Sequence, residues 1–595
     1  MNTNQEYRNR TYNDAGVDRG IVKKAMVSIL ALMLALMLTL TSCGSVAEAG
    51  SAGEVTAQTS TEASYNAASK SEMFTDRDLS GEYDESAAET ITLSGSSIET
   101  SASSGVSVDG STVTITAEGV YIVSGTLSDG QIIVDADDSA KVQIVLKGAS
   151  VISSDSAALY VKSADKVFVT TAAGTENTLA NGGTFTADGD TNVDGAVFAK
   201  DDITFNGSGS LTIDSPAGHG VVGKDDVKIA GGTVTINAAN HGVQANDSVR
   251  LAESDITITS GNDKDGIHVS DDADEEEGTE SDSFFYMSDG SLTINAGDDG
   301  IHADAEALIE GGTIDVAKSY EGIEALSIKV SGGDIKTVAS DDGFNAAGGN
   351  ASSGSQTFGS DDWGGSRGGF SDGGTNGSIE ISGGNIYVKA GGDGIDSNGS
   401  VAISGGYTVV CGPSQGDTSV IDFNSEGTFT GGTFIGTGGE GMAESFSNAT
   451  QGLIAVSVGD QSAGSTVTLK DASDNVLVEV TPELDYAVVY VSTQDMTQGE
   501  TYTLTAGSYS ESITLSDIMY STLNGGRGGN FGGGGPRGGM NGGMDNDANG
   551  GMQSAPDGNM QRGGKHGGMR NGGPGQGETP DGITGATELD GDTQA

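Results

Sequence analysis

The sequence has little sulfur and few aromatic side chains. Among 595 residues there are two cysteines, one tryptophan and seven prolines, and aromatic residues make up 5% of the chain. The cysteines, Cys43 and Cys411, are too few for a disulfide framework and lack zinc-ligand spacing. So few aromatic residues, together with 97 glycines, argue against an ordinary thick hydrophobic core. A thin, repetitive β architecture fits this composition better.

Positive charge is also scarce. The chain has 27 basic against 85 acidic residues, and its formal net charge is −58. Such a protein repels nucleic acid and anionic membrane surfaces but attracts divalent cations. We therefore expect no nucleic-acid partner, and cation binding becomes the first chemistry to look for.

The N-terminus predicts export. Basic residues precede an apolar run over 25–40, which is short for a membrane span and suits the core of a signal peptide. The run ends in Leu-Thr-Ser before Cys43, and this resembles the lipobox of bacterial lipoproteins, in which the cysteine is acylated. We predict a signal peptide over 1–42, lipidation of Cys43 and an extracellular location, with membrane contact only through the lipid. The alternative is an ordinary signal peptide with an incidental cysteine.

Composition divides the rest of the chain. Residues 43–72 are rich in Ala, Ser, Thr and Glu and are expected to form a disordered tether. Residues 73–448 are a succession of short Val- and Ile-rich strands, with a Gly/Ser-rich loop inserted at 350–378. Residues 449–523 lose this rhythm and predict a small β-module that caps the preceding body, and 524–595 predict a disordered Gly-rich tail.

The body carries an internal repeat. An X-Gly-apolar element recurs along it, with glycine at 220 and 242 and again at 300, 322 and 343. One repeat contains three short strands, and a period of about 22 residues is typical of a solenoid in which each unit covers its neighbour. The predicted fold is an all-β, right-handed parallel β-helix, since a left-handed one would usually show a shorter period.

Acidic residues recur at the same corner of the repeat. Equivalent positions on neighbouring repeats lie about 4.8 Å apart, and two carboxylates about 5 Å apart repel by about 3 kcal/mol at an effective dielectric of about 20. Calcium relieves this repulsion, because it accepts six to eight oxygen ligands in flexible geometry. The alternative is that these are solvated turn residues. The predicted calcium ligands are Asp299, Asp304, Glu321, Glu324, Asp342, Asp393 and Asp396. With the Gly/Ser-rich loop extruded, the repeat of Asp342 is expected to stack on that of Asp393, so that Glu321, Glu324 and the three aspartates of these repeats surround one common point.

Long strings of the sequence resemble a known family. They include "MFTDRDLSGEYDESAAETITLSG" (73–95), "GTLSDGQIIVDADDSAKVQIVLKG" (125–148) and "AGGDGIDSNGSVAISGG" (390–406). Over about 73–515 the chain is similar to the bacterial family of carbohydrate-binding β-helix proteins. The resemblance implies a fold like that of polysaccharide lyases, bound calcium, and affinity for cellulose or acidic plant cell-wall glycans such as polygalacturonate.

Catalysis is not expected. A pectate-lyase-like enzyme needs an Arg or Lys positioned to abstract a proton from the sugar. The only arginines between 200 and 400 are Arg250 and Arg367, and neither belongs to the series of recurring acidic positions. A polygalacturonase-like enzyme would use paired aspartates and Gly-His-Gly, as in Asp201-Asp202 and 218–220, yet both recur as corner elements. These enzymes and a structural or adhesive surface stalk remain alternatives.

Aromatic platforms for sugar are scarce in the sequence. Trp363 is the only tryptophan and lies in the Gly/Ser-rich loop. It is a candidate sugar-stacking residue or merely a residue in disorder.

Overall fold

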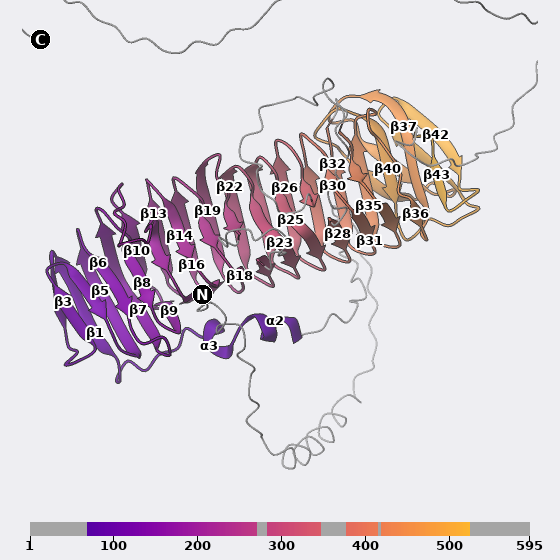
Figure 1. The fold of residues 1–595 in the computed structure, drawn as a ribbon. Helices are drawn as coiled ribbons and strands as arrows, with labels where there is room; N and C mark the ends of the chain where they lie inside the picture. Colours follow the sequence, from indigo (N-terminus) through magenta and orange to yellow (C-terminus); the bar gives the residue numbers. More distant parts are fainter. Residues whose placement is uncertain (1–67, 271–282, 347–376, 414–417, 524–595) are drawn as a thin grey trace, which may run out of the picture. The chain divides into compact units, whose positions relative to one another are not determined.

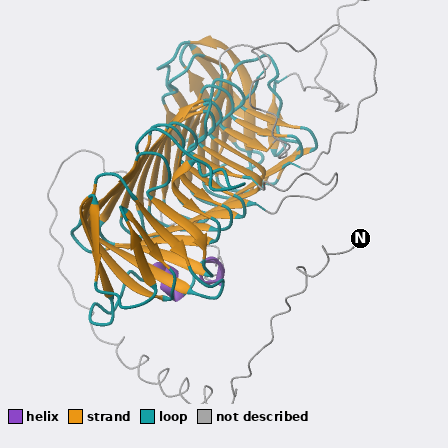
Figure 2. Cartoon of the chain, turned by 60° about the vertical axis from the view of Figure 1, so that its left-hand side comes forward, coloured by secondary structure: helices purple, strands orange, loops and turns teal. Residues whose placement is uncertain are grey.

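The computed structural model describes residues 68–270, 283–346, 377–413 and 418–523 (Figure 1). The described chain is all-β, with one 39-stranded mixed sheet and a separate four-stranded sheet. Figure 2 shows that strands and their connecting loops make up almost all of it. Two short helices, α2 (Ala68–Met73) and α3 (Asp76–Leu79), precede the strands. Within these four ranges, no helix has the length and apolarity needed to cross a membrane.

The large sheet consists mainly of three parallel ladders, because strands pair with the strand about three places further along the chain. The first ladder contains β10 (Glu176–Asn181), β13 (Ser210–Ser215), β16 (Thr233–Ala238), β19 (Asp255–Asn262), β22 (Ser291–Gly297), β24 (Thr313–Ser319), β26 (Asp334–Ala339), β29 (Asn385–Lys389), β32 (Tyr407–Cys411) and β35 (Thr433–Gly438).

The second ladder contains β8 (Leu159–Ser163), β11 (Gly195–Ala199), β14 (His219–Gly223), β17 (Val243–Ala245), β20 (Ile267–Val269), the start of β23 (Ile301–Ile309), the start of β25 (Ile323–Val330), β27 (Phe344–Ala346), β30 (Ile395–Ser397) and β33 (Ile421–Phe423). The third contains β9 (Lys166–Thr171), β12 (Asp202–Gly207), β15 (Val227–Ala230), β18 (Ser248–Leu251), β21 (Phe284–Met287), the ends of β23 and β25, β28 (Ser378–Ile381), β31 (Ser400–Ile403), β34 (Glu426–Phe429) and β36 (Asn448–Ala449).

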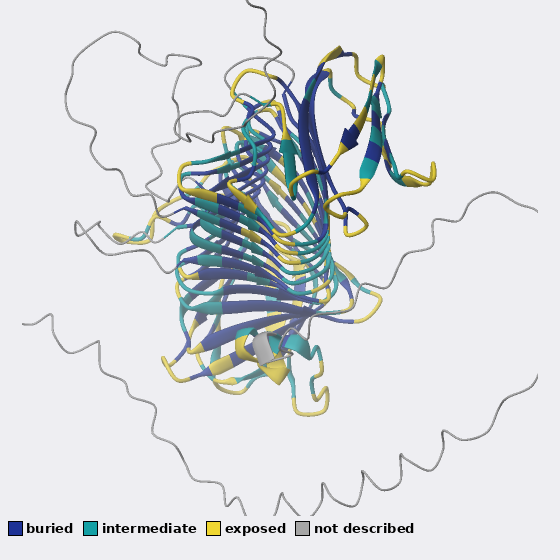
Figure 3. Cartoon of the chain, turned by 90° about the vertical axis from the view of Figure 1, so that its right-hand side faces the viewer, coloured by how far each residue is buried: buried dark blue, intermediate teal, exposed yellow. Residues whose placement is uncertain are grey.

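The core follows from strand alternation. In β16 the side chains of Val234 and Ile236 are buried, whereas that of Thr235 between them faces outward. Successive side chains point to opposite faces of a strand. Val234 pairs with Ile256 on the next strand of the first ladder, so apolar residues stack on like residues. Val227 pairs with Val249, and this offset equals the predicted period. Figure 3 shows buried strands, with exposed positions gathered in the loops.

Antiparallel strands stand at both ends of the ladders. At the N-terminal end β1 (Glu89–Gly95) pairs with β2 (Ser97–Thr100), and β3 (Val106–Asp109) with β4 (Thr112–Ile115). Three strands join these pairs to the ladders: β5 (Gly119–Leu127), β6 (Gln131–Asp135) and β7 (Lys141–Ser153). At the other end β40 (Tyr486–Ser492) runs antiparallel to β35 and to β37 (Leu453–Gln461).

The strands after β37 form a separate cover. Four of them make the small sheet: β38 (Val467–Lys470), β39 (Val476–Val480), β41 (Thr501–Ala506) and β42 (Tyr509–Thr514). The last, β43 (Met519–Ser521), pairs in parallel with β37. Their apolar side chains pack with Val409 and Ile435 of the first ladder in a second core cluster. The parallel ladder therefore ends under an antiparallel strand rather than as an open edge.

Helix α3 is fixed to the third ladder by a buried ion pair. Asp78 is fully buried, and its carboxylate lies 2.7 Å from the ammonium of Lys166 and accepts a 2.8 Å hydrogen bond from Thr204. Burial favours the neutral acid, but Lys166 and the hydrogen bond from the Thr75 backbone hold the pKa of Asp78 at about 2. The carboxylate therefore stays ionised inside the fold.

Candidate functional site

Two columns of polar residues run beside each other along the second ladder. Column 1 is the residue before each corner glycine, and column 2 is the residue two places after it. Val420 replaces the glycine at the last corner, before Asp422. Backbone bonds such as that from the Gly242 N–H to the Asp265 carbonyl align the members of column 1. Strand register aligns column 2. Column 1 contains His219, His241, Asp265, Asp299, Glu321, Asp342 and Asp393, and column 2 contains Gln244, His268, His302, Glu324, Asn345, Asp396 and Asp422.

Packing explains why the corner residue is glycine. A Cβ on Gly242 would lie 2.2 Å from Cγ2 of Ile258 and 2.6 Å from the carbonyl oxygen of Gly266. Gly220 and Gly266 are confined in the same way. Any side chain at these positions would push neighbouring strands apart, so the X-Gly-apolar motif arises from close stacking.

The N-terminal part of the columns is a stack of imidazole rings. The ring centroids of His219 and His241 lie 5.2 Å apart, those of His241 and His268 4.4 Å, and those of His268 and His302 4.9 Å. Burial lowers the pKa of His219 to about 3 and also lowers that of His241. Both rings are therefore neutral near pH 7.

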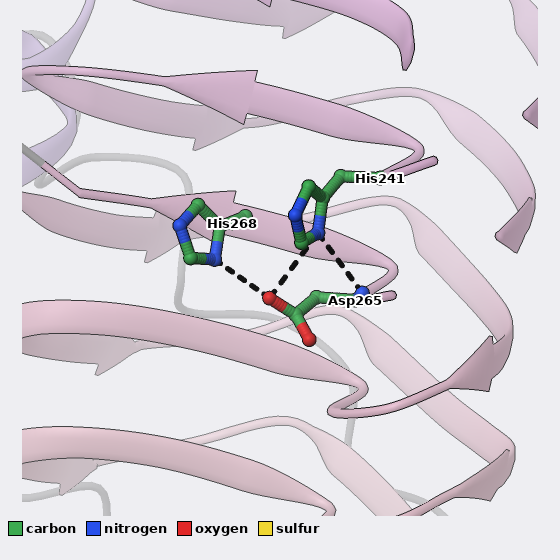
Figure 4. Close-up of side chains that lie close together, drawn as sticks. All are labelled: His241, Asp265 and His268. Atoms are coloured by element: carbon green, nitrogen blue, oxygen red, sulfur yellow. Dashed lines mark hydrogen bonds and ion pairs between the residues drawn. The ribbon is translucent and has the colours of Figure 1, made fainter. Parts of the chain in front are cut away.

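Asp265 lies between two of these rings, as Figure 4 shows. Its Oδ2 is 2.6 Å from Nδ1 of His268 and 3.3 Å from Nδ1 of His241. Burial opposes ionisation of this carboxyl, but the two neighbouring imidazoles lower its pKa. The three ligand atoms lie within 4.8 Å of one another, close enough for one metal ion.

His302 occupies the middle of the columns and is surrounded by carboxyl groups. Its Nδ1 lies 2.6 Å from Glu324 and 3.6 Å from Asp299, and its Nε2 lies 3.2 Å from Asp304. Burial disfavours a charged ring, yet hydrogen bonds to these carboxyls raise the pKa of His302 well above its usual range. The protonated ring in turn outweighs burial and lowers the pKa of Glu324.

Oxygen donors alone make up the C-terminal part. The carboxylates of Asp342, Asp393 and Asp396 each place an oxygen within 4.8 Å of the others. Burial, followed by repulsion from neighbouring carboxylates, raises the pKa of Asp342 to about 8 and that of Asp396 to about 6. Burial also raises the pKa of Asp393 to about 7. The repeat that carries Asp342 lies next to that of Asp393, as predicted, because Gly343 N–H donates to the Asp393 carbonyl.

The predicted single cluster is divided in the structure. Glu324 groups with Asp299 and His302 rather than with Asp342. Glu321 accepts a 2.8 Å hydrogen bond from Asn345, and burial raises its pKa to about 10. The expectation that Glu321 and Glu324 share one point with the three aspartates was therefore wrong, since His302 and Asn345 take up their oxygens. The metal role of all seven acidic residues stays a prediction.

The histidines are the residues that sequence reasoning missed as ligands. His241 and His268 occupy different offsets from their glycines, so the motif alone does not place them together. The signal was nevertheless present, because an imidazole precedes Gly220 and Gly242 and follows Gly266 and Gly300.

An open pocket lies on the outward face of the first ladder. It has a volume of about 390 Å³ and spans β24, β26, β29 and β32. Tyr407, 43% exposed, lines it together with Tyr387. Polar side chains stand in register with these rings, since Lys336 pairs with Tyr387 and Asn385 with Tyr407. No sequence motif marks the two tyrosines as a pair. They belong to different repeats, and only the strand register brings both into one pocket.

A second pocket of about 510 Å³ follows β11 and β14. Lys200 and Lys224 line it on adjacent repeats, and Asn192 and Gln244 add amide groups. The Lys224 N–H donates to the carbonyl of Ala199, which holds the two lysines side by side. The same pocket is also lined by Asp190 and Asp194, so two lysines and two aspartates share it.

Several predicted features lie outside the described residues. They are Cys43 with the signal peptide, Trp363 with most of the Gly/Ser-rich loop, and the tail from residue 524. Cys411 is described, and it is buried as a small apolar residue would be, with the Tyr387 hydroxyl 3.7 Å from its sulfur.

A family model and a curated protein that resemble part of this chain carry the same description. Residues 109–362 match the family model described as carbohydrate-binding domain-containing protein. A curated protein of that description from Acetivibrio thermocellus is 36% identical over 136 residues, which are 22% of this chain and 48% of the relative. The chain thus spans about half the length of that relative. The resemblance to a carbohydrate-binding family is confirmed over the matched residues, which do not reach Tyr387 or Tyr407.

One solved structure is also similar. It is described as the polysaccharide lyase-like protein from C. thermocellum, gadolinium derivative. The match has 30% sequence identity, covers 42% of this chain and 95% of that chain, and has a TM-score of 0.36.

Proposed function

We propose that this protein binds polysaccharide on the outward face of the first ladder and has no catalytic activity of its own. The observation that carries the proposal is the open pocket in which Tyr387 and Tyr407 stand among carboxylate, amide and ammonium groups. Aromatic rings offer a flat apolar surface for the C–H faces of sugar rings, while a few placed polar groups fix the orientation of hydroxyls. The family match over 109–362 supports a carbohydrate ligand.

An extended polymer suits this face because the face itself repeats. Thr212, Thr235, Thr257 and Thr293 pair with one another in register on successive strands of the first ladder. Their hydroxyls recur at about 4.8 Å, the spacing of neighbouring strands. Cellulose is a neutral ligand of this kind. Acidic plant glycans such as polygalacturonate are the second candidate, because Lys200 and Lys224 offer ammonium groups in the other pocket.

We infer calcium as the cofactor of the C-terminal part of the columns. Asp342, Asp393 and Asp396 supply only oxygen, and the buried Oδ1 of Asn345, beside Asp396 in column 2, has no hydrogen-bond partner. Calcium accepts carboxylate and amide oxygens together in flexible geometry, whereas magnesium demands a stricter octahedron. Asp299, Asp304, Glu321 and Glu324 stay candidates for further calcium positions.

A binding role suits the basic residues better than a lyase role. Arg250 donates to Asp226 at 3.0 Å, to Ser248 at 2.8 Å and to the Met73 carbonyl at 3.1 Å, so its guanidinium is held in structural contacts. His219, the centre of the Gly-His-Gly motif, is buried against His241. Neither is placed to take a proton from a sugar.

The architecture and location complete the proposal. Parallel pairing of Val227 with Val249, one period further along the chain, supports a β-helix, and parallel crossovers are almost always right-handed. We propose a right-handed parallel β-helix that is exported by the segment over 1–42 and held at the cell surface by acylated Cys43. Export and anchoring rest on the sequence alone.

Exposed tyrosine provides the first test. Replacing Tyr407 by Ala should weaken binding of the purified protein to cello-oligosaccharides about fivefold or more, because it removes a sugar-stacking ring worth roughly 1 kcal/mol or more. Isothermal titration calorimetry measures the affinity. A parallel titration compares the binding of polygalacturonate by the parent protein and by Lys200→Gln, which removes an ammonium group from the lysine-lined pocket.

Tyr320→Ala is the matched control, because this tyrosine is 39% exposed and lies outside the pocket. It should bind as the parent protein does. Full affinity of Tyr407→Ala for every glycan would contradict the pocket assignment. Absence of all glycan binding by the folded parent protein would favour a structural or adhesive surface role.

A further inference from the structure

The donor atoms of the two columns change from one end to the other. Four of the five histidines of the chain stand in the stack formed by His219, His241, His268 and His302, and the fifth, His566, lies outside the described residues. From Glu321 to Asp422 the columns offer carboxyl and amide groups only. The two continuous columns therefore present imidazole nitrogen at one end and only hard oxygen donors at the other.

We propose that His241, Asp265 and His268 form a site for a borderline divalent transition metal such as Zn²⁺, separate from the calcium site proposed at Asp342, Asp393 and Asp396. Imidazole suits zinc, copper and nickel, whereas calcium takes oxygen ligands almost entirely. Two imidazoles and one carboxylate are three protein ligands, and a water or another ligand completes a tetrahedral set.

The distances fit this coordination. With metal–nitrogen and metal–oxygen bonds of about 2.1 Å, the ligand atoms of a tetrahedral site lie about 3.4 Å apart. Oδ2 of Asp265 is 3.3 Å from Nδ1 of His241 and 2.6 Å from Nδ1 of His268. The second separation has to widen by about 1 Å at most. The third, between the ligand nitrogens of the two histidines, is below 4.8 Å.

Metal binding at this site has to replace hydrogen-bonding and stacking contacts that the two histidines already make. The Asp265 N–H donates to Nδ1 of His241 at 3.0 Å, and the two rings are stacked with 23° between their planes. Coordination replaces that hydrogen bond and tilts the rings, because a metal lies in the plane of an imidazole lone pair. Coordination therefore perturbs both histidine rings, which spectroscopy can detect.

The surroundings favour a cation that enters from solvent. The side chains of His241 and His268 are 13% and 21% exposed, whereas Asp265 behind them is 6% exposed. Asp298 and Asp299 each place an oxygen within 4.8 Å of Asp265 and add negative charge. His219, 9% exposed, stacks on His241, and its Nδ1 has no hydrogen-bond partner. A buried nitrogen donor thus adjoins the site.

Competitive metal binding tests the proposal. Chelator-stripped protein is titrated with Co²⁺ and with Zn²⁺ in the presence of millimolar Ca²⁺, and bound metal is counted by inductively coupled plasma mass spectrometry. The parent protein should bind Zn²⁺ that Ca²⁺ does not displace, and Co²⁺ should give the visible absorption of a nitrogen-coordinated tetrahedral ion. His241→Gln/His268→Gln should weaken Zn²⁺ binding at least about tenfold and leave calcium stoichiometry unchanged.

Asp342→Asn/Asp393→Asn is the matched reverse variant, and it should lose calcium but keep Zn²⁺. If the double histidine variant does not fold, His268→Gln alone replaces it, because this ring is the more exposed of the two. Zn²⁺ that is displaced by Ca²⁺, or Zn²⁺ stoichiometry that a folded histidine variant retains, would overturn the site. Absence of Zn²⁺ binding by the parent protein would do so as well, and the three residues would then be a hydrogen-bonded network only.

Discussion

A single residue, His302, balances the charge in the middle of the columns. Its two ring nitrogens lie near Glu324, Asp299 and Asp304, and its side chain is 3% exposed. A buried carboxylate without a partner is costly, so the protonated imidazole supplies the positive charge that we propose a calcium ion supplies at Asp342, Asp393 and Asp396. Sequence reasoning could not assign this role, because His302 and Glu324 belong to different repeats and only the strand register brings them together.

Removal of this charge should destabilise the protein. We expect His302→Gln to lower the free energy of unfolding by about 3–5 kcal/mol at pH 7, since it leaves buried carboxylates without their cation. Denaturant unfolding in the presence of a chelator measures the loss.

His268→Gln is the control for this change. His268 is paired with Asp265 and its side chain is 21% exposed, so its replacement should cost about 1 kcal/mol. Equal losses for the two variants would show that His302 carries no special charge role.

At the scale of the element, corner glycines and strand register decide which side chains of neighbouring repeats lie next to each other. Glycine at each corner lets successive strands of the second ladder approach closely, and this approach aligns the two columns. The sequence predicted the period, the strands and the corner, because all three follow from the spacing of apolar residues and glycine. It did not predict how the acidic residues divide into groups, because hydrogen bonds from His302 and Asn345 decide that.

A side chain at the corner should separate the strands. Gly242→Ala places a methyl group 2.2 Å from Ile258 and 2.6 Å from the Gly266 carbonyl oxygen. We expect a loss of about 1–3 kcal/mol from overpacking, measured by thermal or denaturant unfolding. Gly412→Ala is the control, because the nearest atoms to its Cβ lie 3.5 Å away. Similar stability of the two variants would contradict the close-stacking explanation.

The corner between the second and third ladders should make stability depend on pH. Burial, a hydrogen bond with Asp247 and the charge of Asp202 raise the pKa of Asp225 from 3.8 to about 7. The folded protein therefore keeps a proton that the unfolded chain releases, and the free energy of unfolding falls as pH rises from about 4 to about 7. Asp225→Asn cannot ionise and still donates to Asp247.

This variant should be more stable than the parent protein at pH 8 and nearly equal to it at pH 4, as judged by melting temperatures. Asp109→Asn, at an exposed position, should shift neither value. A parallel pH dependence of the parent protein and Asp225→Asn would rule out Asp225 as the titrating group.

At the scale of the whole molecule, an excess of negative charge is held together by paired strands. The net charge of −58 repels itself, and part of it is concentrated along the two columns. Cations that bind only the folded state offset this repulsion by mass action.

Removal of calcium should therefore lower the melting temperature. The effect should be larger at pH 8 than at pH 5, because burial and neighbouring carboxylates raise the pKa of Asp342 to about 8 and that of Asp396 to about 6, and protons replace the cation at low pH. Saturating calcium at about 100 times its dissociation constant would contribute about 2.7 kcal/mol. Differential scanning calorimetry with and without chelator measures the shift, and an unchanged transition after verified metal removal would contradict a stabilising ion.

The antiparallel strands at both ends have a consequence for how such proteins change over evolutionary time. Because β1 to β4 and β40 cover the terminal strands, duplication of one internal repeat lengthens the ladders without creating a new open edge. Each added copy extends the row of outward hydroxyls by one strand. For the polysaccharide binding proposed above, affinity for a long polymer would then grow through multivalency rather than through a better single contact. Gene duplication can thus adjust the proposed affinity for a polymer one repeat at a time, while both ends of the fold stay the same.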